Sequence, residues 1–279
     1  MTASVVQIAS VAASSGGTAL PAVAMGAPVT AGNLLVYAVF AASNPAVRVA
    51  PFPATGQNGW TSAGISVGSL SGSSNGQVEV FTRTALMGDG TTPPSPYSSG
   101  NYSTYFFACI QWEVSGVTGG IDAANSSATM GTTGGTTASL TSGHAAELAL
   151  LASGNFGILS TIAPSGSPGT WTVDGTENGY TPQIAWAHQA IPLSGSTVDA
   201  AISGSGDDFV YFQMLLEGTT SATETANPVT LALSGVSFNV KAQKYSEGGA
   251  VALVLGGVAF KINTVDVTAE PVLVNFYTF

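Results

Sequence analysis

Positively charged side chains are scarce in this chain. Its 279 residues include five Lys and Arg against fifteen Asp and Glu, so the formal net charge is −10. Proteins that bind DNA, RNA or anionic membranes rely on clustered cations that neutralise phosphates. This chain has too few cations for such a cluster. We therefore expect no nucleic-acid binding and no attraction to anionic membrane surfaces.

Cysteine and histidine are almost absent as well. Cys109 is the single cysteine, which excludes an intrachain disulfide, and the apolar run Tyr105–Ile110 around it predicts a small buried core residue. With only His144 and His188 beside it, the chain has too few ligands for a zinc or redox site. It contains neither a Gly-x-Ser-x-Gly nucleophile motif nor a phosphate-binding glycine loop. The sequence therefore favours a non-catalytic chain that carries no cofactor.

Long apolar runs and a charged N-terminal region are also missing. The longest apolar stretch near the N-terminus, Leu34–Ala42, is far shorter than the roughly 20 residues that span a bilayer. No Lys or Arg precedes Arg48, so the charged first region of a secretory signal is lacking. We expect a soluble chain that does not insert into a membrane and is not exported through a signal peptide.

Small residues and turn formers take the place of charge. Charged residues make up 7% of the chain, against roughly 25% in a typical soluble protein, so the polar faces of long helices cannot be built. The alternation of polar and apolar residues in Gln77–Arg83 is typical of a half-buried strand. These patterns predict an all-β protein with a jelly-roll-like β-sandwich over residues 1–217. The segments with strand character are Ser4–Ile8, Asn33–Phe40, Gln77–Thr84, Tyr105–Val114, Glu147–Leu151, Gln183–Ala190 and Phe209–Leu216.

The two halves of the predicted sandwich, about 1–125 and 140–217, contain a similar order of motifs. A loose internal duplication that yields two interleaved sheets explains this order; the alternative is that amphipathic strands resemble one another in general. The paired motifs are Gly32–Val36 with Glu147–Leu150, Gly59-Trp60-Thr61 with Thr170-Trp171-Thr172, Phe81 and Arg83 with Trp186 and His188, and Glu113 with Glu217.

The composition changes after Glu217. Residues 218–227 contain no large apolar side chain and predict a linker. Beyond it, the pattern Leu-x-Leu-x-Gly-Val-x-Phe-x-(Val/Ile) occurs at 231–240 and again at 253–262, and its glycine indicates a kink, bulge or tight turn inside a hairpin. A β module of about 50 residues, 228–279, has a marginal core. We expect it to pack on the first module or on copies of itself, which would make the protein a homo-oligomer.

Carboxylates in strands and loops are the remaining chemical candidates. Glu113 and Glu217 end strands at matching places, and glycosidases use two such acids across a sugar cleft, but both adjoin turns in which an acid is easily solvated. The loops with Asp89, Asp174 and Asp207 offer oxygen ligands that calcium accepts, although without EF-hand spacing. We expect structural acids at all five positions, with a structural Ca²⁺ in one of the loops as an open alternative.

Aromatic residues beside loops indicate where the chain could contact a partner. Trp60 and Trp171 are predicted to anchor the edge of the core, with stacking on sugars as the alternative. Tyr97, Tyr102 and Tyr180 lie in or beside loops rich in Pro, Ser and Gly, where Tyr provides rigid amphipathic contact area. These three tyrosines are the predicted surface contacts.

Four motifs follow one another in the first half of the chain: Gly32–Val36, Gly59–Thr61, Val80–Arg83 and Ile110–Val117 with Ile121-Asp122. Their order resembles a β-sandwich pattern of bacteriophage and prophage tail or structural proteins. The resemblance covers mainly residues 4–125 and, more weakly, 140–217. The C-terminal Leu-x-Leu-x-Gly-Val-x-Phe copies look like small β repeats at the ends of phage virion proteins. The resemblance implies a role in assembly or adhesion and carries over no catalytic residue.

The leading hypothesis is therefore a non-catalytic virion protein of a bacteriophage. It would serve as a tail fibre, tail-tip or receptor-binding component, or as a capsid decoration or spike. Its partners would be other virion proteins, further copies of itself, and a glycan or protein of the host surface. It would assemble in the host cytoplasm and reach the outside by lysis. A secreted carbohydrate-binding module is the alternative, and a polysaccharide hydrolase is disfavoured by the missing nucleophile and base.

Overall fold

The chain divides into two compact units, Met1–Thr219 (unit 1) and Thr220–Phe279 (unit 2). The boundary falls within the polar segment 218–227. Each unit is described by itself below. The computed structural model describes residues 2–13, 19–43, 57–68, 75–97, 105–130, 134–155, 158–164, 170–177, 183–205, 208–218, 229–233, 236–240, 251–255 and 258–262.

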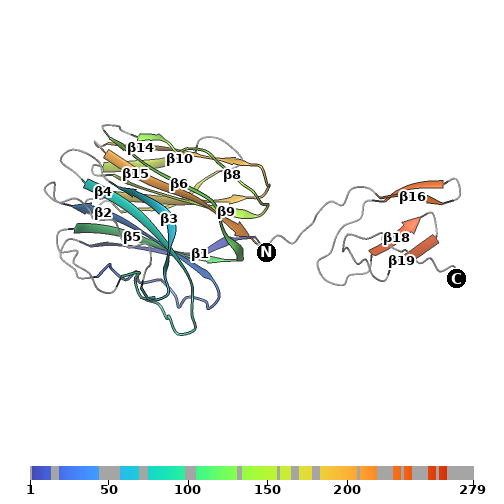
Figure 1. The fold of residues 1–279 in the computed structure, drawn as a ribbon, viewed down its shortest axis with the longest axis horizontal. Coiled ribbons are helices and arrows are strands. Elements are labelled where there is room, and N and C mark those ends of the chain that lie inside the picture. The colour runs from blue at the N-terminus through green and yellow to red at the C-terminus, as the bar shows by residue number, and fades with distance from the viewer. Residues whose placement is uncertain are drawn as a thin grey trace. The chain divides into compact units, whose positions relative to one another are not determined.

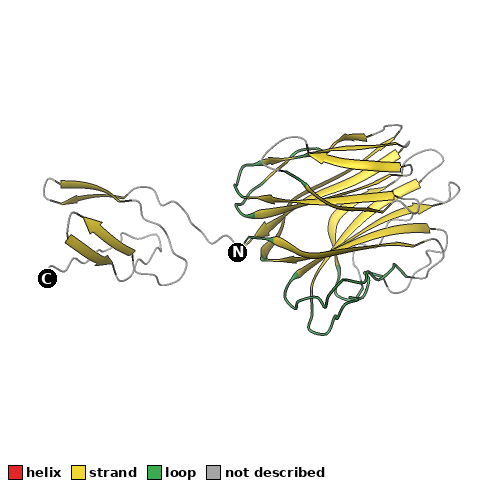
Figure 2. Cartoon of the chain, turned by 180° about the vertical axis from the view of Figure 1, so that it is seen from behind, coloured by secondary structure: helices red, strands yellow, loops and turns green. Residues whose placement is uncertain are grey.

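The described residues form strands and loops and contain no helix, as Figure 2 shows. This confirms the predicted all-β class, and it follows from the shortage of residues that could form the polar face of a helix. No helix in this part of the chain has the length and apolar character needed to cross a bilayer.

The first half of unit 1 forms a five-stranded antiparallel sheet, here called sheet I. Its strand order is β1-β5-β2-β4-β3. Two edge positions are thus occupied by β1 and β3, and β2 lies in the centre. The strands are β1 (Ser4–Ala13), β2 (Leu34–Ser43), β3 (Thr61–Gly68), β4 (Asn75–Thr84) and β5 (Tyr105–Ser115).

The second half forms another five-stranded antiparallel sheet, sheet II, with the order β11-β12-β9-β15-β6. Its strands are β6 (Val117–Met130), β9 (Glu147–Asn155), β11 (Thr172–Glu177), β12 (Gln183–Ile191) and β15 (Asp208–Gly218). Five further strands form two small sheets, β10-β14-β7 and β13-β8. They are β7 (Gly134–Thr136), β8 (Leu140–Thr141), β10 (Ile158–Pro164), β13 (Thr197–Val198) and β14 (Ala200–Ser205).

Sheets I and II pack face to face and enclose the main core, which confirms the predicted β-sandwich (Figure 1). Alternate residues of each strand point to opposite faces, and one face of each sheet contributes to a shared cluster. At its centre, the Phe212 ring of sheet II lies between Phe40 and Trp112 of sheet I, with ring centroids 6.3 and 6.1 Å away. Gly154 makes room for Phe40, because a Cβ at this position would lie 2.5 Å from the Phe40 ring.

The outer face of each sheet is covered by its own connections. Sheet I carries a cluster in which Tyr37 and Phe81 pack against loop residues such as Leu20 and Tyr97. Sheet II carries a cluster that includes Leu151 and residues of β8, β13 and β14. Because both faces of both sheets are covered, the central strands are apolar on each side. This explains continuous runs such as Leu34–Ala42, in which period-two alternation is hidden.

The two sheets follow one plan. Read from the edge, β1, β5, β2, β4 and β3 correspond to β6, β15, β9, β12 and β11. Irregularities in the pairing also fall at corresponding places. Strand β1 has a bulge at Val6 opposite the end of β5, and β6 has one at Asp122 opposite the end of β15. Strands β3 and β11 each shift register directly after their second residue. Edge strand β3 lies beside β6, and β1 lies beside β11, as expected if a two-fold rotation relates the sheets.

Register refines the motif pairing that the sequence predicted. Thr61 pairs with Thr82, and Thr172 with His188, so His188 corresponds to Thr82 and Trp186 to Val80. The predicted match of Trp186 and His188 with Phe81 and Arg83 is therefore wrong by one residue. Because alternate residues of a strand point to opposite faces, Trp186 lies on the opposite face of its sheet from the face that Phe81 occupies in sheet I. Across the central strands, Glu113 corresponds to Leu215 rather than to Glu217.

The connectivity also differs from the expectation. Each sheet is formed by one contiguous half of unit 1, so the halves do not interleave as predicted. In a jelly roll, two Greek keys distribute their strands over both sheets. In this protein, every strand pairing within sheet I or sheet II joins strands of the same half of unit 1. The described sandwich therefore lacks the strand sharing of a jelly roll.

In unit 2 the structure describes two hairpins that repeat each other. One pairs β16 (Val229–Leu233) with β17 (Val236–Val240), and the other pairs β18 (Val251–Leu255) with β19 (Val258–Ile262). In both, a Leu pairs with a Phe in the middle of the ladder: Leu231 with Phe238, and Leu253 with Phe260. The repeated glycines, Gly235 and Gly257, for which the sequence predicted a kink, bulge or tight turn, lie outside the described residues.

Candidate functional site

Polar side chains gather at one end of the sandwich, here called the Gly218 end. Strand β15 finishes there at Gly218, β5 turns directly into β6 through Gly116, and β1, β2 and β9 begin there. Because β5 and β6 are consecutive, the corresponding ends of sheets I and II lie at the same end of the molecule. Two buried glutamates, one in each sheet, occupy this end.

Glu113 is the buried glutamate of sheet I at this end, and it is fully satisfied. Its carboxylate accepts hydrogen bonds from the Gln7 side chain, from the Thr30 backbone N–H at 2.8 Å and from the Asn33 side-chain amide. Burial alone would raise the pKa of Glu113, but these donors outweigh it and lower the pKa. The carboxylate therefore anchors the loop before β2; the expected solvation of Glu113 beside a turn is wrong, because donors of the chain take the place of water.

Glu147 is the buried glutamate of sheet II, and its surroundings differ. Its side chain is fully buried. Oε1 accepts the His144 backbone N–H at 2.8 Å, whereas no group donates a hydrogen bond to Oε2. Burial and the neighbouring Asp122 carboxylate raise the pKa of Glu147 from 4.5 to about 7. No sequence pattern predicts this site, because Asp122 lies far from His144 and Glu147 in the chain and the three residues match no motif.

His144 and Glu217 complete this second cluster. The His144 ring lies 3.5 Å from Asp122 through Nε2 and 3.6 Å from Glu217 through Nδ1. Asp122 also accepts the backbone N–H of Gly143 at 2.7 Å. Glu217, predicted to be solvated at a strand end, thus lies beside an imidazole at the rim of the sandwich, with its side chain about one quarter exposed.

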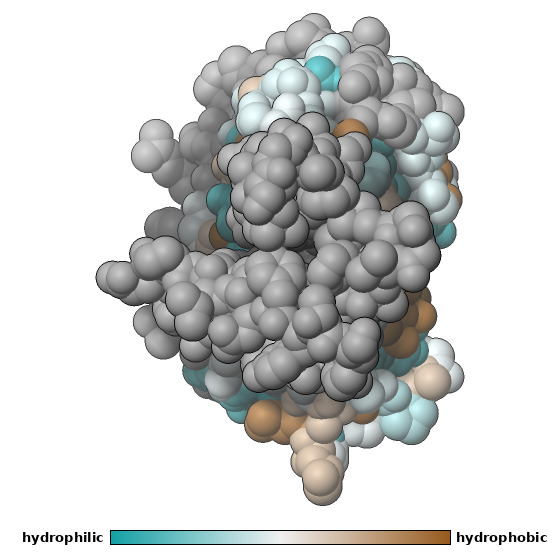
Figure 3. Space-filling view, turned by 90° about the vertical axis from the view of Figure 1, so that its right-hand side faces the viewer, coloured by the Kyte–Doolittle hydropathy of each residue, from teal (hydrophilic) through white to brown (hydrophobic). Residues whose placement is uncertain are grey.

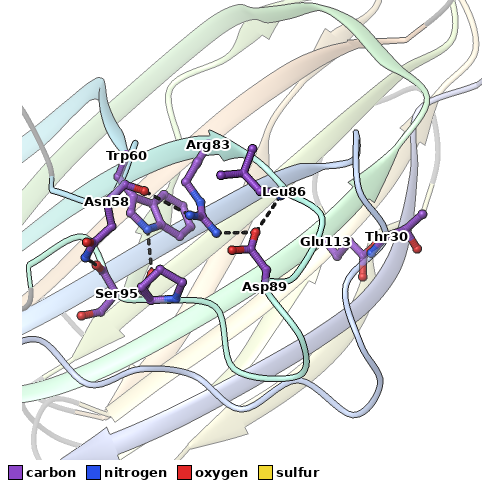
Figure 4. Close-up of polar contacts among 9 residues, drawn as sticks. Thr30, Asn58, Trp60, Arg83, Leu86, Asp89, Ser95 and Glu113 are labelled. Atoms are coloured by element: carbon purple, nitrogen blue, oxygen red, sulfur yellow. Dashed lines mark hydrogen bonds and ion pairs between the residues drawn. The ribbon is translucent and has the colours of Figure 1, made fainter.

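A buried ion pair holds the loops on the outer face of sheet I (Figure 4). Arg83 and Asp89 lie 2.6 Å apart with side chains 5% and 8% exposed. The Arg83 guanidinium also donates to the Asn58 carbonyl at 3.0 Å and stacks over the Trp60 ring. Asp89 in turn accepts the backbone N–H of Leu86. Every part of this network binds a turn of the chain itself.

His188 lies on β12, in a strand as predicted, and its Nδ1 is 2.8 Å from the Asp174 carboxylate on β11. Asp89 and Asp174 thus contact Arg83 and His188, and the alternative of a structural Ca²⁺ in one of the loops stays a prediction. Asp207 lies outside the described residues. In the part of the chain that the structure describes, no group of three or more His, Cys, Asp or Glu side chains is arranged to hold a metal ion.

The aromatic residues that were predicted to contact a partner do not form a surface in the described residues. Tyr97 is buried and packs edge-on against Phe81 at 5.5 Å, so its assignment as a surface contact is wrong; its ring fills the core between sheet I and its loop. Tyr102 and Tyr180 lie outside the described residues. Trp60 and Trp171 are buried core anchors, as predicted, and cannot present a face for sugar stacking.

Cys109 is also buried, as expected, and burial raises its pKa to about 12. The thiol is therefore protonated at neutral pH and is not a nucleophile. The surface of unit 1 carries separate hydrophobic patches among hydrophilic residues in the view of Figure 3. Met87 and Leu193, at corresponding turns of the two sheets, are the most exposed large apolar residues of the described chain, at 94% and 66%.

Neither a protein family, nor a curated protein, nor a solved structure matches this chain.

Proposed function

We propose that the chain is a non-catalytic structural component of a bacteriophage virion, acting in assembly or host attachment. Its partners are other virion proteins and further copies of itself, with a host glycan or protein as the target if it lies at the particle surface. It assembles in the host cytoplasm and becomes extracellular after lysis. The motif resemblance of residues 4–125 supports this class.

The use of polar side chains in unit 1 is the observation that supports a structural role most directly. Glu113, the Arg83–Asp89 pair and the indoles of Trp60 and Trp171 all bind backbone groups of the chain's own turns. Such bonds stiffen the connections around a covered sandwich. A protein that must keep its shape within a particle needs this property.

Unit 2 supports an assembly role. Each of its described hairpins has two strands of five residues, and an isolated two-stranded hairpin is marginally stable in water. In the sequence of each hairpin, large apolar residues recur at alternate positions, a pattern that predicts one apolar face. Packing this face against copies of the module supplies the missing core and makes the protein a homo-oligomer.

Immunogold electron microscopy tests the virion assignment. Antibodies raised against the full chain are applied to particles purified from the lysate of the source strain. Labelling at a fixed place on the particles supports the proposal and shows whether that place is tail or capsid. Label confined to soluble lysate fractions, with the chain absent from the particles by mass spectrometry, contradicts it.

Light scattering after size-exclusion chromatography tests the assembly role of unit 2. The full chain is expected to be an oligomer, and the double substitution Leu231→Lys with Leu253→Lys is expected to dissociate it. The matched control places the same charges on the alternate positions of the same strands, Thr230→Lys with Ala252→Lys, and leaves the oligomer intact. A monomeric full chain, or equal behaviour of both variants, contradicts the assembly role.

A further inference from the structure

The cluster at Glu147 contains a buried carboxylate oxygen that has no hydrogen-bond donor. Glu147 is fully buried, its Oε2 has no hydrogen-bond partner, and the partly exposed Asp122 of β6 is the neighbouring acid. An unpaired charge in such a place is costly, and a proton on Glu147 removes the cost. The missing donor and the neighbouring acid therefore favour the protonated form of Glu147.

Sheet I provides an internal comparison. Asn33 directly precedes β2, and Glu147 occupies the corresponding position as the first residue of β9; Thr30 and His144 stand three residues earlier. In sheet I, the N–H of Thr30 is accepted by Glu113, which Asn33 and Gln7 also satisfy. In sheet II the same loop position donates to Glu147 alone. The two ends thus share one architecture, but only sheet II lacks a full set of donors.

The other titratable groups around the pair come from two further elements. His144, in the loop before β9, lies 3.5 Å from Asp122 and 3.6 Å from Glu217 at the end of β15. Among the described residues, these are the ionisable groups that face the pair. Close packing holds them in place, because a Cβ at Gly119 would collide with the Glu217 carboxylate and one at Gly143 would lie 2.7 Å from Asp122.

The loop that carries His144 contacts both the first and the last residues of unit 1. The backbone carbonyl of Ala146 accepts the N–H of Ala3, just before β1. The same carbonyl lies so close to Gly218 that a Cβ at Gly218 would overlap it. The loop therefore holds the first strand and the last residues of β15, from which the chain continues into unit 2.

We propose that Asp122, His144, Glu147 and Glu217 form a pH-dependent latch that fastens the loop 142–146 to the ends of β6 and β15. Below neutral pH, Glu147 keeps a proton that its Oε2 shares with the neighbouring Asp122 carboxylate, and His144 contacts Asp122 and Glu217. Above neutral pH, Glu147 releases this proton to the solvent, the partly exposed Asp122 carboxylate repels the buried Glu147 carboxylate, and the loop loosens.

The sign of the effect follows from linkage. The folded state holds the Glu147 proton between pH 4.5 and about 7, a range in which the unfolded chain has lost it. The stability of unit 1 therefore falls as the pH rises through this window. Between pH 5 and pH 8, the folding equilibrium constant is expected to fall on the order of 100-fold from this group.

Urea unfolding of the full chain at pH values between 5 and 8 tests the latch. All four tryptophans lie in unit 1, so their fluorescence reports its unfolding. Glu147→Gln, which mimics the protonated acid, is expected to remove most of the fall in stability with pH. The matched control, Glu113→Gln in sheet I, lowers stability but keeps the wild-type dependence. The latch is refuted if Glu147→Gln retains the full dependence or if both variants lose it equally.

A local measurement separates a latch from a general change in stability. Hydrogen exchange of the wild type and of Glu147→Gln is compared at pH 8, so that the intrinsic exchange rates cancel. The wild type is expected to exchange several-fold faster in residues 142–146 and near Ala3, and equally fast in residues 30–33. Asp122→Asn is expected to slow exchange at the same loop. Equal exchange there in all three proteins, or a difference spread evenly over unit 1, refutes the proposal.

Discussion

Trp60 and Trp171 occupy corresponding positions in the two sheets, and each indole N–H donates to a backbone carbonyl of its covering loop, that of Pro94 at 2.7 Å and that of Asp199 at 2.9 Å. Each tryptophan directly precedes an edge strand, β3 or β11. The two residues therefore fasten equivalent loops to equivalent edges, although the loops differ in length and secondary structure.

Replacing either tryptophan by phenylalanine is expected to destabilise unit 1. Each substitution removes a buried hydrogen bond and leaves a carbonyl unsatisfied, a loss of about 1–3 kcal/mol. Trp60→Phe should cost more, because Arg83 stacks on the Trp60 ring and Phe holds a cation less well. Urea unfolding followed by circular dichroism measures both. Losses below a few tenths of a kcal/mol would show that the indole bonds do not hold the loops.

Gly32 and Ala146 provide a matched test of backbone strain. They stand at corresponding positions before β2 and β9, with φ of 91° and 63°. A Cβ at Gly32 would meet nothing within 4 Å, so Gly32→Ala reports the backbone alone and should cost about 1–2 kcal/mol. Ala146→Gly should stabilise by about 0.5 kcal/mol, since the relief of strain exceeds the entropy of glycine. Thermal unfolding checks the opposite signs; two changes of the same sign would contradict this account.

Breaking the Arg83–Asp89 pair should be costly because both side chains are buried. Asp89→Asn is expected to destabilise unit 1 by about 3 kcal/mol, since it leaves the guanidinium charge without its partner. The double variant Arg83→Met with Asp89→Asn should lose less than the sum of the single variants, because one change removes the need for the other. A strictly additive result in urea unfolding would argue against coupling.

Acid should weaken the loop before β2 through Glu113. The pKa of Glu113 is lowered in the folded state, so its contribution to stability is present above the ordinary pKa of a glutamic acid and is lost as the pH falls below it. Glu113→Gln should lower stability at neutral pH and flatten this acid limb. Unfolding curves at neutral and acidic pH provide the measurement; an unchanged acid limb in the variant would exclude Glu113 as its source.

Local patterns predicted the β class, the buried thiol and the anchoring tryptophans. The chain has few residues that could form the polar face of a helix, and Cys109, Trp60 and Trp171 lie in apolar or strand-flanking segments that the sequence reveals. The same reasoning failed for Tyr97, because a composition rich in Pro and Ser is found both in exposed loops and in loops that fold back onto a sheet. Burial of a loop depends on which strand lies beneath it, and that partner lies distant in the chain.

The candidate site could not be read from the chain. Asp122, His144, Glu147 and Glu217 are separated by up to 95 positions and match no motif. Their approach depends on the antiparallel pairing of β15 with β6 and β9. The difference between Glu113 and Glu147 likewise depends on tertiary donors, since Gln7 and Asn33 reach one carboxylate and have no counterpart at the other.

Composition and alternation by themselves determined that this protein is built of strands, because the preference for a pleated backbone and the burial of one face act on neighbouring residues. Tertiary structure alone decided that each half forms its own sheet, which residues correspond across the two-fold arrangement, and which buried glutamate lacks a full set of hydrogen-bond donors. These properties come from strand register, and one residue of slippage would exchange the buried and exposed faces without changing the local pattern.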